Sequence, residues 1–185
     1  MIAAYKQTVD RHRQRIFSFA HYSLRVREDA EDITQEVFIK LWHNWNRVDH
    51  EKVGAWLMRV AHNAVVDHVR KNRHADQKRD EFKEPDQTAS EVDEVAKLDQ
   101  EYFNQHLQLA IKALNDPFRS ILVMRDIQGM SYAEIEQSLD MSESQVKVYL
   151  HRGRRKLREN PRLREIFATM NQSQSGQARA MKETQ

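Results

Sequence analysis

SYAEIEQSLDMSESQVKVYLHRGRRK, at residues 131–156, predicts two short helices joined by a tight turn. Ser131 with Glu134, and Ser142 with Gln145, each form the pattern of a capping box, in which two side chains accept hydrogen bonds from free amides at a helix start. The two boxes mark helix starts that lie eleven residues apart. Asp140 lies between the helices and tolerates the left-handed backbone that such a turn often needs.

The second of these helices has an apolar side and a basic side. Val146 and Leu150 lie one turn apart and form an apolar stripe, which can pack on Ile135 and Leu139 of the first helix. The remaining face carries side chains suited to phosphates and base edges, namely Lys147, Tyr149, His151, Arg152, Arg154 and Arg155. This division predicts a helix-turn-helix whose second helix enters the major groove of DNA.

The distribution of charge supports this interpretation. Residues 147–165 hold eight basic and two acidic side chains, a net charge of +6, whereas the net charge of the whole chain is +2. Such a concentration is typical of phosphate binding. The alternative is a surface helix hairpin with a solvated basic face, but the concentration of charge favours DNA binding.

Composition limits the class of protein. The chain has 185 residues, of which 39% are hydrophobic and 31% charged, with only 4 Gly and 3 Pro, which favours a helical protein over a sheet or a disordered chain. There is no cysteine, so we expect neither disulfides nor a thiolate zinc site. No secretory signal is visible, and no apolar run reaches the roughly 20 residues that span a bilayer. We therefore expect a cytoplasmic protein.

Apolar residues recur at helical spacing in three N-terminal segments. They are Tyr5, Val9, Ile16, Ala20 and Leu24 in the first, Ile33, Val37, Leu41 and Trp45 in the second, and Trp56, Leu57, Val60, Ala61 and Ala64 in the third. Asp29 is the predicted N-cap of the second helix. Further along, Asp116 is predicted to cap a helix with Pro117 at its first position.

We predict an all-α protein with two small helical domains joined by a flexible linker. Residues 1–73 form a three- to four-helix bundle, and residues 101–170 form a four-helix domain that contains the helix-turn-helix. Between them, residues 74–100 are polar and include Pro85, which is typical of a linker. Residues 171–185 contain few apolar side chains and are predicted to be a disordered tail.

Three motifs, in this order, resemble the extracytoplasmic-function (ECF) sigma factors of the bacterial sigma-70 family. They are DAEDITQEVFIKLW at residues 29–42, AWLMRVAHNAVVDHVRK at 55–71, and the end of the helix-turn-helix, YLHRGRRKL, at 149–157. The resemblance implies a promoter-specificity subunit of RNA polymerase with no cofactor. It implies that residues 1–73 act as sigma region 2 and residues 101–170 as sigma region 4.

The resemblance also implies partners for the first motif. In the family, this segment docks on the clamp helices of the largest subunit of core RNA polymerase, and region 4 contacts the flap. The residues implied here are Asp29, Asp32, Gln35, Glu36, Phe38 and Trp42. Ala30, Phe38 and Trp42 form a second apolar face, so this helix has more apolar surface than one small bundle must bury. Phe38 and Trp42 could equally be core residues. An anti-sigma factor that covers both domains is a further implied partner.

Two sets of DNA-contacting residues follow from the resemblance. The −10 element would be read by Arg59, Asn63, Asp67, Arg70 and Lys71, whose polar groups are suited to flipped bases and phosphates. The −35 element would be read by Ser144, Gln145, Lys147, Val148, His151, Arg152, Arg154 and Arg155. Trp56 is interpreted as a core residue. Two positions depart from the family pattern: Glu136 replaces a small Ala, and Ser144 stands where a Gly-Thr pair often begins the recognition helix.

Two other classes of function were weighed against this one. An enzyme is disfavoured because the chain has no metalloprotease motif, no phosphate-binding glycine loop and no nucleophile elbow. His62 and His68 are six residues apart and lie on different helix faces, so they do not predict a metal site. The second class is a free-standing helix-turn-helix regulator, which the acidic and aromatic helix at residues 29–42 argues against.

Overall fold

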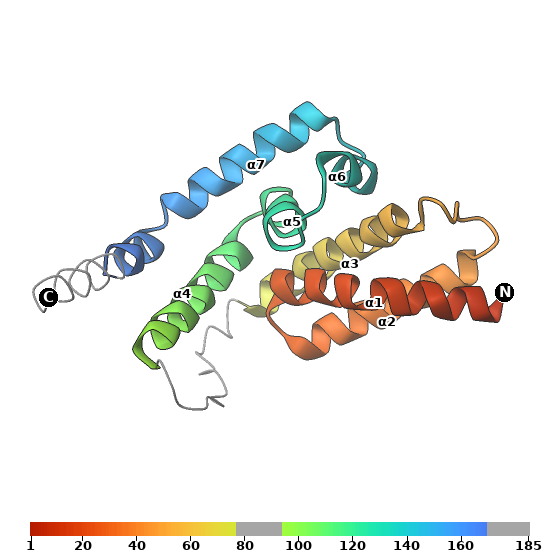
Figure 1. Cartoon of the computed structure of the whole chain (residues 1–185), viewed down its shortest axis with the longest axis horizontal. Coiled ribbons are helices and arrows are strands. Elements are labelled where there is room, and N and C mark those ends of the chain that lie inside the picture. The colour runs from red at the N-terminus through yellow and green to blue at the C-terminus, as the bar shows by residue number, and fades with distance from the viewer. Residues whose placement is uncertain (77–93, 170–185) are drawn as a thin grey trace, which may run out of the picture.

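The computed structural model describes residues 1–76 and 94–169, although the side chains of residues 73–76 and 94–100 are not described. Within these ranges the regular structure is helical (Figure 1), which confirms the all-α prediction. The N-terminal half contains α1 (Ile2–Leu24), α2 (Arg27–Asn44) and α3 (Val53–Asp76). The C-terminal half contains α4 (Glu94–Ala113), α5 (Phe118–Leu122), the π-helical segment η1 (Val123–Ile127), α6 (Tyr132–Leu139) and α7 (Glu143–Arg158). Residues 161–169 form a further helix.

The three N-terminal helices bury one apolar stripe each. On α2, the predicted stripe of Ile33, Val37, Leu41 and Trp45 is buried, and none of these side chains is more than 8% exposed. It packs with Phe19 of α1 and with residues of α3 in one hydrophobic core. Because a surface helix buries the side on which apolar residues recur every three or four positions, the spacing in the sequence predicted this core correctly.

The start of α2 differs from the prediction. Asp29 was expected to cap the helix, but α2 begins at Arg27 and its N-cap is Val26. The preceding helix ends at Leu24, and Arg25 turns the chain in the left-handed conformation, so α2 begins almost at once. Asp29 therefore lies in the first turn, where a negative charge interacts favourably with the helix dipole. Its carboxylate contacts Nε2 of His68 at 3.1 Å.

The start of α5 also differs from the prediction. Pro117 lies just before the first helical residue, Phe118, and Asp116 is not the cap. The Asp116 carboxylate instead accepts hydrogen bonds from the side chains of Arg119 and Ser120. Arg119 is only 4% exposed, and a buried guanidinium is strongly destabilising without an anionic partner. The need to pair this charge explains why the carboxylate does not cap the helix.

The helix-turn-helix forms as its sequence predicted. The backbone N–H of Ser131 donates to Oε2 of Glu134 at 2.7 Å, and that of Ser142 donates to Oε1 of Gln145 at 2.8 Å. Both reciprocal capping boxes are complete. Between the helices, Asp140 adopts the left-handed conformation with φ 56°. Local side-chain chemistry therefore fixes both helix starts and the turn.

The two halves of the chain pack against each other. Helix α3 contacts α6, and α1 contacts both α4 and η1, so buried residues of both halves belong to one hydrophobic cluster. Both ends of the predicted linker, residues 74–100, are helical, because α3 extends to Asp76 and α4 begins at Glu94, so the linker was predicted too long. The rest of that linker, and the predicted C-terminal tail, lie outside the described residues. Across the residues that are described, none of the helices combines the length and apolar character that a membrane span requires.

Candidate nucleic-acid interface

Helix α7 presents the basic face that its sequence predicted. Val146 and Leu150 are buried at 0% and 2% exposure, and they attach the opposite side of the helix to the core. Of the predicted −35 residues, all are exposed: Ser144, Gln145, Lys147, Val148, His151, Arg152, Arg154 and Arg155. Val148 is 46% exposed, and an apolar side chain among basic ones can contact the methyl group of thymine.

Gly153 fixes how closely α7 approaches α5. A Cβ at this position would lie 3.0 Å from Cδ1 of Leu122 and 3.5 Å from Cβ of Phe118. Leu122 is almost fully buried and has little room to move. A side chain at this position would therefore press on Leu122, on the side of α7 that faces away from its basic surface.

The cations of α7 have two kinds of partner. Lys147 and Arg155 pair with Glu143 and Glu159 on the same helix, at 2.6 and 3.0 Å. The hydrogen bond that Lys147 donates to Glu143 raises the pKa of Lys147, which stays protonated. Exposed pairs one turn apart are weak, so a phosphate can replace the carboxylate at little cost.

Arg154 is held differently. Its guanidinium donates from Nε and Nη2 to both carboxylate oxygens of Asp126 at 2.9 and 2.5 Å. Asp126 belongs to η1, so this bidentate pair joins α7 to the preceding helical segment. The arrangement assigns Arg154 a part in holding the recognition helix in place, whereas its predicted contact with DNA stays a prediction.

Two further residues at this surface were missed by the sequence reasoning. The Tyr132 ring, at the first position of α6, lies between Arg125 at 4.7 Å and Lys147 at 5.4 Å from its centroid. Arg125 also donates to the carbonyl oxygen of Met130 at 2.5 Å. These two cations add positive charge beside the start of α6, a cluster that favours anions. An aromatic residue directly after the capping Ser131 was the signal that could have indicated it.

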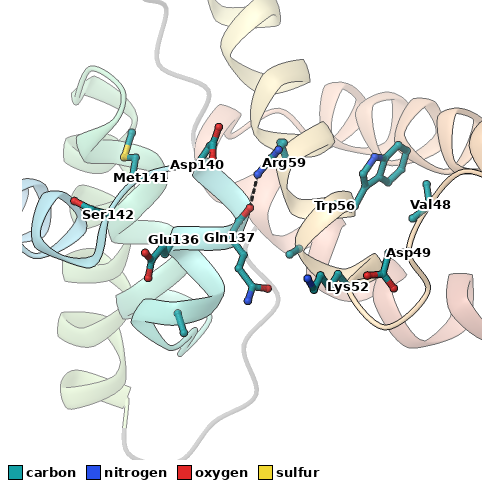
Figure 2. A pocket seen from close by; sticks show the side chains of 12 residues that line it. Val48, Asp49, Lys52, Trp56, Arg59, Glu136, Gln137, Asp140, Met141 and Ser142 are labelled. Atoms are coloured by element: carbon teal, nitrogen blue, oxygen red, sulfur yellow. Dashed lines mark hydrogen bonds between the residues drawn. The ribbon is translucent and has the colours of Figure 1, made fainter.

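The predicted −10 residues lie on α3. Arg59, Asn63, Asp67, Arg70 and Lys71 are all exposed along that helix. Asp67 pairs with Arg70 at 3.0 Å. Arg59 differs from the others, because its guanidinium donates hydrogen bonds to α6 of the other half (Figure 2).

A cleft of about 850 Å³ lies beside Arg59, between α3 and α6. Its N-terminal wall includes Lys52 and Trp56, and its C-terminal wall includes Glu136 and Asp140 (Figure 2). Trp56, which was interpreted as a core residue, is only partly buried: it packs on the core and also lines the cleft. Asp49 also lies on the N-terminal wall, so that wall has a net charge of +1, whereas the C-terminal wall has a net charge of −2.

The predicted polymerase-binding residues lie on α2. Asp32, Gln35, Glu36 and Trp42 are exposed, Asp29 is partly exposed, and Phe38 is buried at 7% exposure. A groove of about 700 Å³ between α1 and α2 is lined in part by Gln35, Phe38 and Ile39. Ile39 was not predicted as a site residue, yet it is 55% exposed, and Trp42 is 41% exposed with its ring edge-on to Tyr5 at 5.0 Å.

Comparisons with known proteins identify the family. Residues 8–75 match the model of sigma-70 region 2, and residues 105–157 match that of sigma-70 region 4. The ECF RNA polymerase sigma factor SigW of Bacillus subtilis is 30% identical over 173 residues, which cover 86% of this chain and 89% of that protein. The chain belongs to the ECF sigma factors. SigE of Mycolicibacterium smegmatis is 28% identical over 84% of this sigma factor, which spans 61% of that longer relative.

Solved structures show the same fold. CnrH, in a structure with the cytosolic domain of CnrY, aligns with a TM-score of 0.62 at 23% identity and covers 85% of this sigma factor and 86% of that chain. The sigma factor RpoE of Bartonella quintana, in complex with the anti-sigma factor NepR, aligns with a TM-score of 0.61 at 20% identity. The alignment covers 84% of this sigma factor and 94% of that chain. The helical architecture is therefore that of sigma factors.

Proposed function

We propose that this sigma factor binds core RNA polymerase through α2 and directs initiation at promoters whose −10 element contacts α3 and whose −35 element contacts α7. The observation that carries the proposal is the exposed basic face of α7, on a helix-turn-helix with both capping boxes complete. Such a helix suits the major groove. The protein itself performs no catalysis, and it acts in the cytoplasm, where core polymerase is found.

Helix α2 has the composition of a docking surface for polymerase. Ile39 and Trp42 are exposed large apolar side chains, and Gln35 and Glu36 supply polar groups on the same helix. Exposed apolar groups that polar residues surround are typical of protein interfaces. We assign the clamp helices of the largest subunit to this surface and the flap to the C-terminal half.

The two DNA surfaces differ chemically in a way that matches the two tasks. On α7, cations and an exposed valine are suited to duplex base edges and phosphates. On α3, Asn63 and Asp67 offer an amide and a carboxylate, which can hydrogen-bond to the edges of unpaired bases. We propose that α7 binds closed promoter DNA and that α3 captures the separated strand.

An anti-sigma factor is the proposed regulator. The proposal is supported by two neighbours in fold, CnrH and RpoE, which are solved in complex with the cytosolic domain of CnrY and with the anti-sigma factor NepR. Its chemical basis here is the exposed apolar surface of α2, which polymerase and an inhibitor would compete for. Failure of every protein in a host extract to bind the sigma factor, with polymerase removed, would count against this part.

The test is run-off transcription on genomic DNA of the source bacterium, with the sigma factor alone, core polymerase alone, and both. Discrete transcripts from the mixture only are expected. Trp42→Ala should reduce them by weakening polymerase binding, whereas His43→Ala, at an exposed neighbouring position, is the matched control. Asn63→Ala should reduce permanganate reactivity of the opened strand with little loss of duplex binding. Specific DNA binding by the protein alone, without new transcripts, would indicate a free-standing regulator instead.

A further inference from the structure

A residue proposed to bind DNA is engaged by the other half of the chain. Arg59 of α3 donates from Nη2 to the carbonyl oxygen of Gln137 at 2.6 Å (Figure 2). It also donates from Nε to the carbonyl oxygen of Ser138 at 3.3 Å. We infer that this contact is a latch, which holds the two halves together in the absence of promoter DNA, and that Arg59 leaves the latch to bind the DNA backbone at the −10 element. The inference rests on the proposed function, because it uses the assignment of Arg59 to that element.

The end of α6 explains why a guanidinium binds there. The last carbonyl groups of a helix have no partner within the helix and lie at the negative end of its dipole. In α6, the N–H groups of Asp140 and Met141 both donate to Glu136, which leaves the carbonyls of Gln137 and Ser138 for Arg59. A guanidinium donates to phosphate oxygens with the same groups, and more strongly. The carbonyls and the DNA backbone therefore compete for one side chain.

A second set of contacts holds the same region without using a predicted DNA residue. Arg15 of α1 pairs with Glu134 of α6 at 3.4 Å. Gln128, after η1, donates from Nε2 to the carbonyl oxygen of Arg15 at 2.7 Å. Because these bonds join α1 to the segment around α6, their loss should loosen the closed arrangement while Arg59 stays intact.

The cleft beside the latch adds charge complementarity. Asp49, Lys52 and Arg59 line it from one half, with a net charge of +1, and Glu136 and Asp140 line it from the other, with a net charge of −2 (Figure 2). Glu136 is one of the two positions at which the helix-turn-helix departs from the family pattern, which usually has Ala there. A carboxylate on this wall attracts the cations opposite, so Glu136 favours closure, and added salt weakens this attraction.

The first test measures whether the latch closes the protein. The sequence has no cysteine, so Glu28→Cys on α2 and Lys112→Cys on α4, both exposed, can carry spin labels on the full chain. Double electron–electron resonance should give one narrow distance distribution for the parent. Arg15→Glu combined with Glu136→Ala should shift it to longer, broader distances. Arg11→Glu with Glu101→Ala makes the same change in net charge at exposed positions elsewhere and should leave it unchanged.

The second test measures whether closure masks Arg59. Fluorescence anisotropy with a labelled single strand of mixed sequence should show that the opened variant binds about fivefold or more tightly than its charge-matched control, the lower end of typical coupling between sites. Adding Arg59→Ala to the opened variant should remove this gain. Arg59→Ala in the labelled chain should also lengthen the distances, because it removes the latch itself. A distance distribution that is unchanged in both the opened variant and Arg59→Ala overturns the latch and leaves the proposed function standing. Opening without a gain in affinity overturns the double role of Arg59 and counts against its assignment to the −10 element.

Discussion

The two proposed DNA surfaces of this sigma factor differ in what engages their cations. On α7, Lys147 and Arg155 pair with carboxylates of their own helix, one turn away. On α3, Arg59 donates to carbonyls of α6, from the other half of the chain. A phosphate can displace a partner on the same helix after a side-chain rotation, whereas displacing α6 requires movement of a whole domain. Lys147 and Arg155 of the recognition helix are therefore ready to bind DNA in this arrangement, and Arg59 of α3 is not.

This difference suggests an order of events at a promoter. Exposed basic residues on α7 attract duplex DNA at long range, in a manner that depends on salt. Release of α6 from α3 would follow, when core polymerase or the separated strand supplies competing contacts.

The largest effect is expected on α7 itself. Lys147→Ala with Arg152→Ala should weaken binding of the holoenzyme to its promoter duplex by about 2–6 kcal/mol, because each side chain that contacts a base edge contributes about 1–3 kcal/mol. The dependence of affinity on salt should also become less steep, since fewer counterions are released. Binding is measured by anisotropy over a range of salt concentrations. Lys6→Ala with Arg11→Ala removes the same charge from α1, and an equal loss there would show that only net charge matters.

The next effect concerns the anchoring of α7, not its DNA surface. Gly153→Val should lower the free energy of unfolding by about 1–3 kcal/mol, because the new side chain would overlap Leu122 in a tightly packed core. Chemical denaturation measures this change. Arg152→Val places the same β-branched residue on the exposed side of the helix and should change stability by only about 0.5 kcal/mol or less. Similar losses for the two variants would mean that close packing against Leu122 does not require the glycine, because helix propensity alone favours valine over glycine.

Local chemistry determined which helix starts could be predicted from the sequence. Ser131 and Ser142 find their capping partners three residues away, within the same first turn, so the sequence alone was sufficient. Asp29 and Asp116 offered the same capping chemistry, but their carboxylates pair with His68 and Arg119. His68 is far from Asp29 in sequence, and no local sequence pattern indicated that Arg119 would be buried. A tertiary partner that outcompetes a cap is not visible in a local pattern.

The same limit applies to the candidate site. Helical periodicity alone predicted which face of α7 is buried and which carries the exposed cations, because that division depends only on residue spacing. The partners of Arg154 and Arg59 could not be predicted in this way. Asp126 lies 28 residues before Arg154, and Gln137 lies 78 residues after Arg59. Such pairings are set by how helices pack, and they decide which cations are free to bind DNA.

The smallest expected effect is a pH dependence of the closed arrangement, and it arises at His62 of α3. Its Nδ1 lies 2.9 Å from Oγ of Ser120, in the other half of the chain. The Ser120 hydroxyl donates its only proton to Asp116, so His62 donates to Ser120 from Nδ1. Burial lowers the pKa of His62 from its ordinary value of 6.5; the carboxylate of Asp116 opposes this shift, and the guanidinium of Arg119 adds to it.

The sign of the effect follows from this lowered pKa. Closure favours neutral His62, and separation of the halves restores its ordinary pKa of 6.5. The contribution of His62 to closure is therefore complete above that pH and is lost as the pH falls below it. With spin labels at Glu28→Cys and Lys112→Cys, the share of long distances should rise from about pH 7.5 to about pH 5.5. His62→Gln should flatten this rise, while His12 and His21 still titrate in α1. An equally steep rise in His62→Gln would place the titrating group elsewhere, and His62 would then have no part in holding α3 against the other half of the chain.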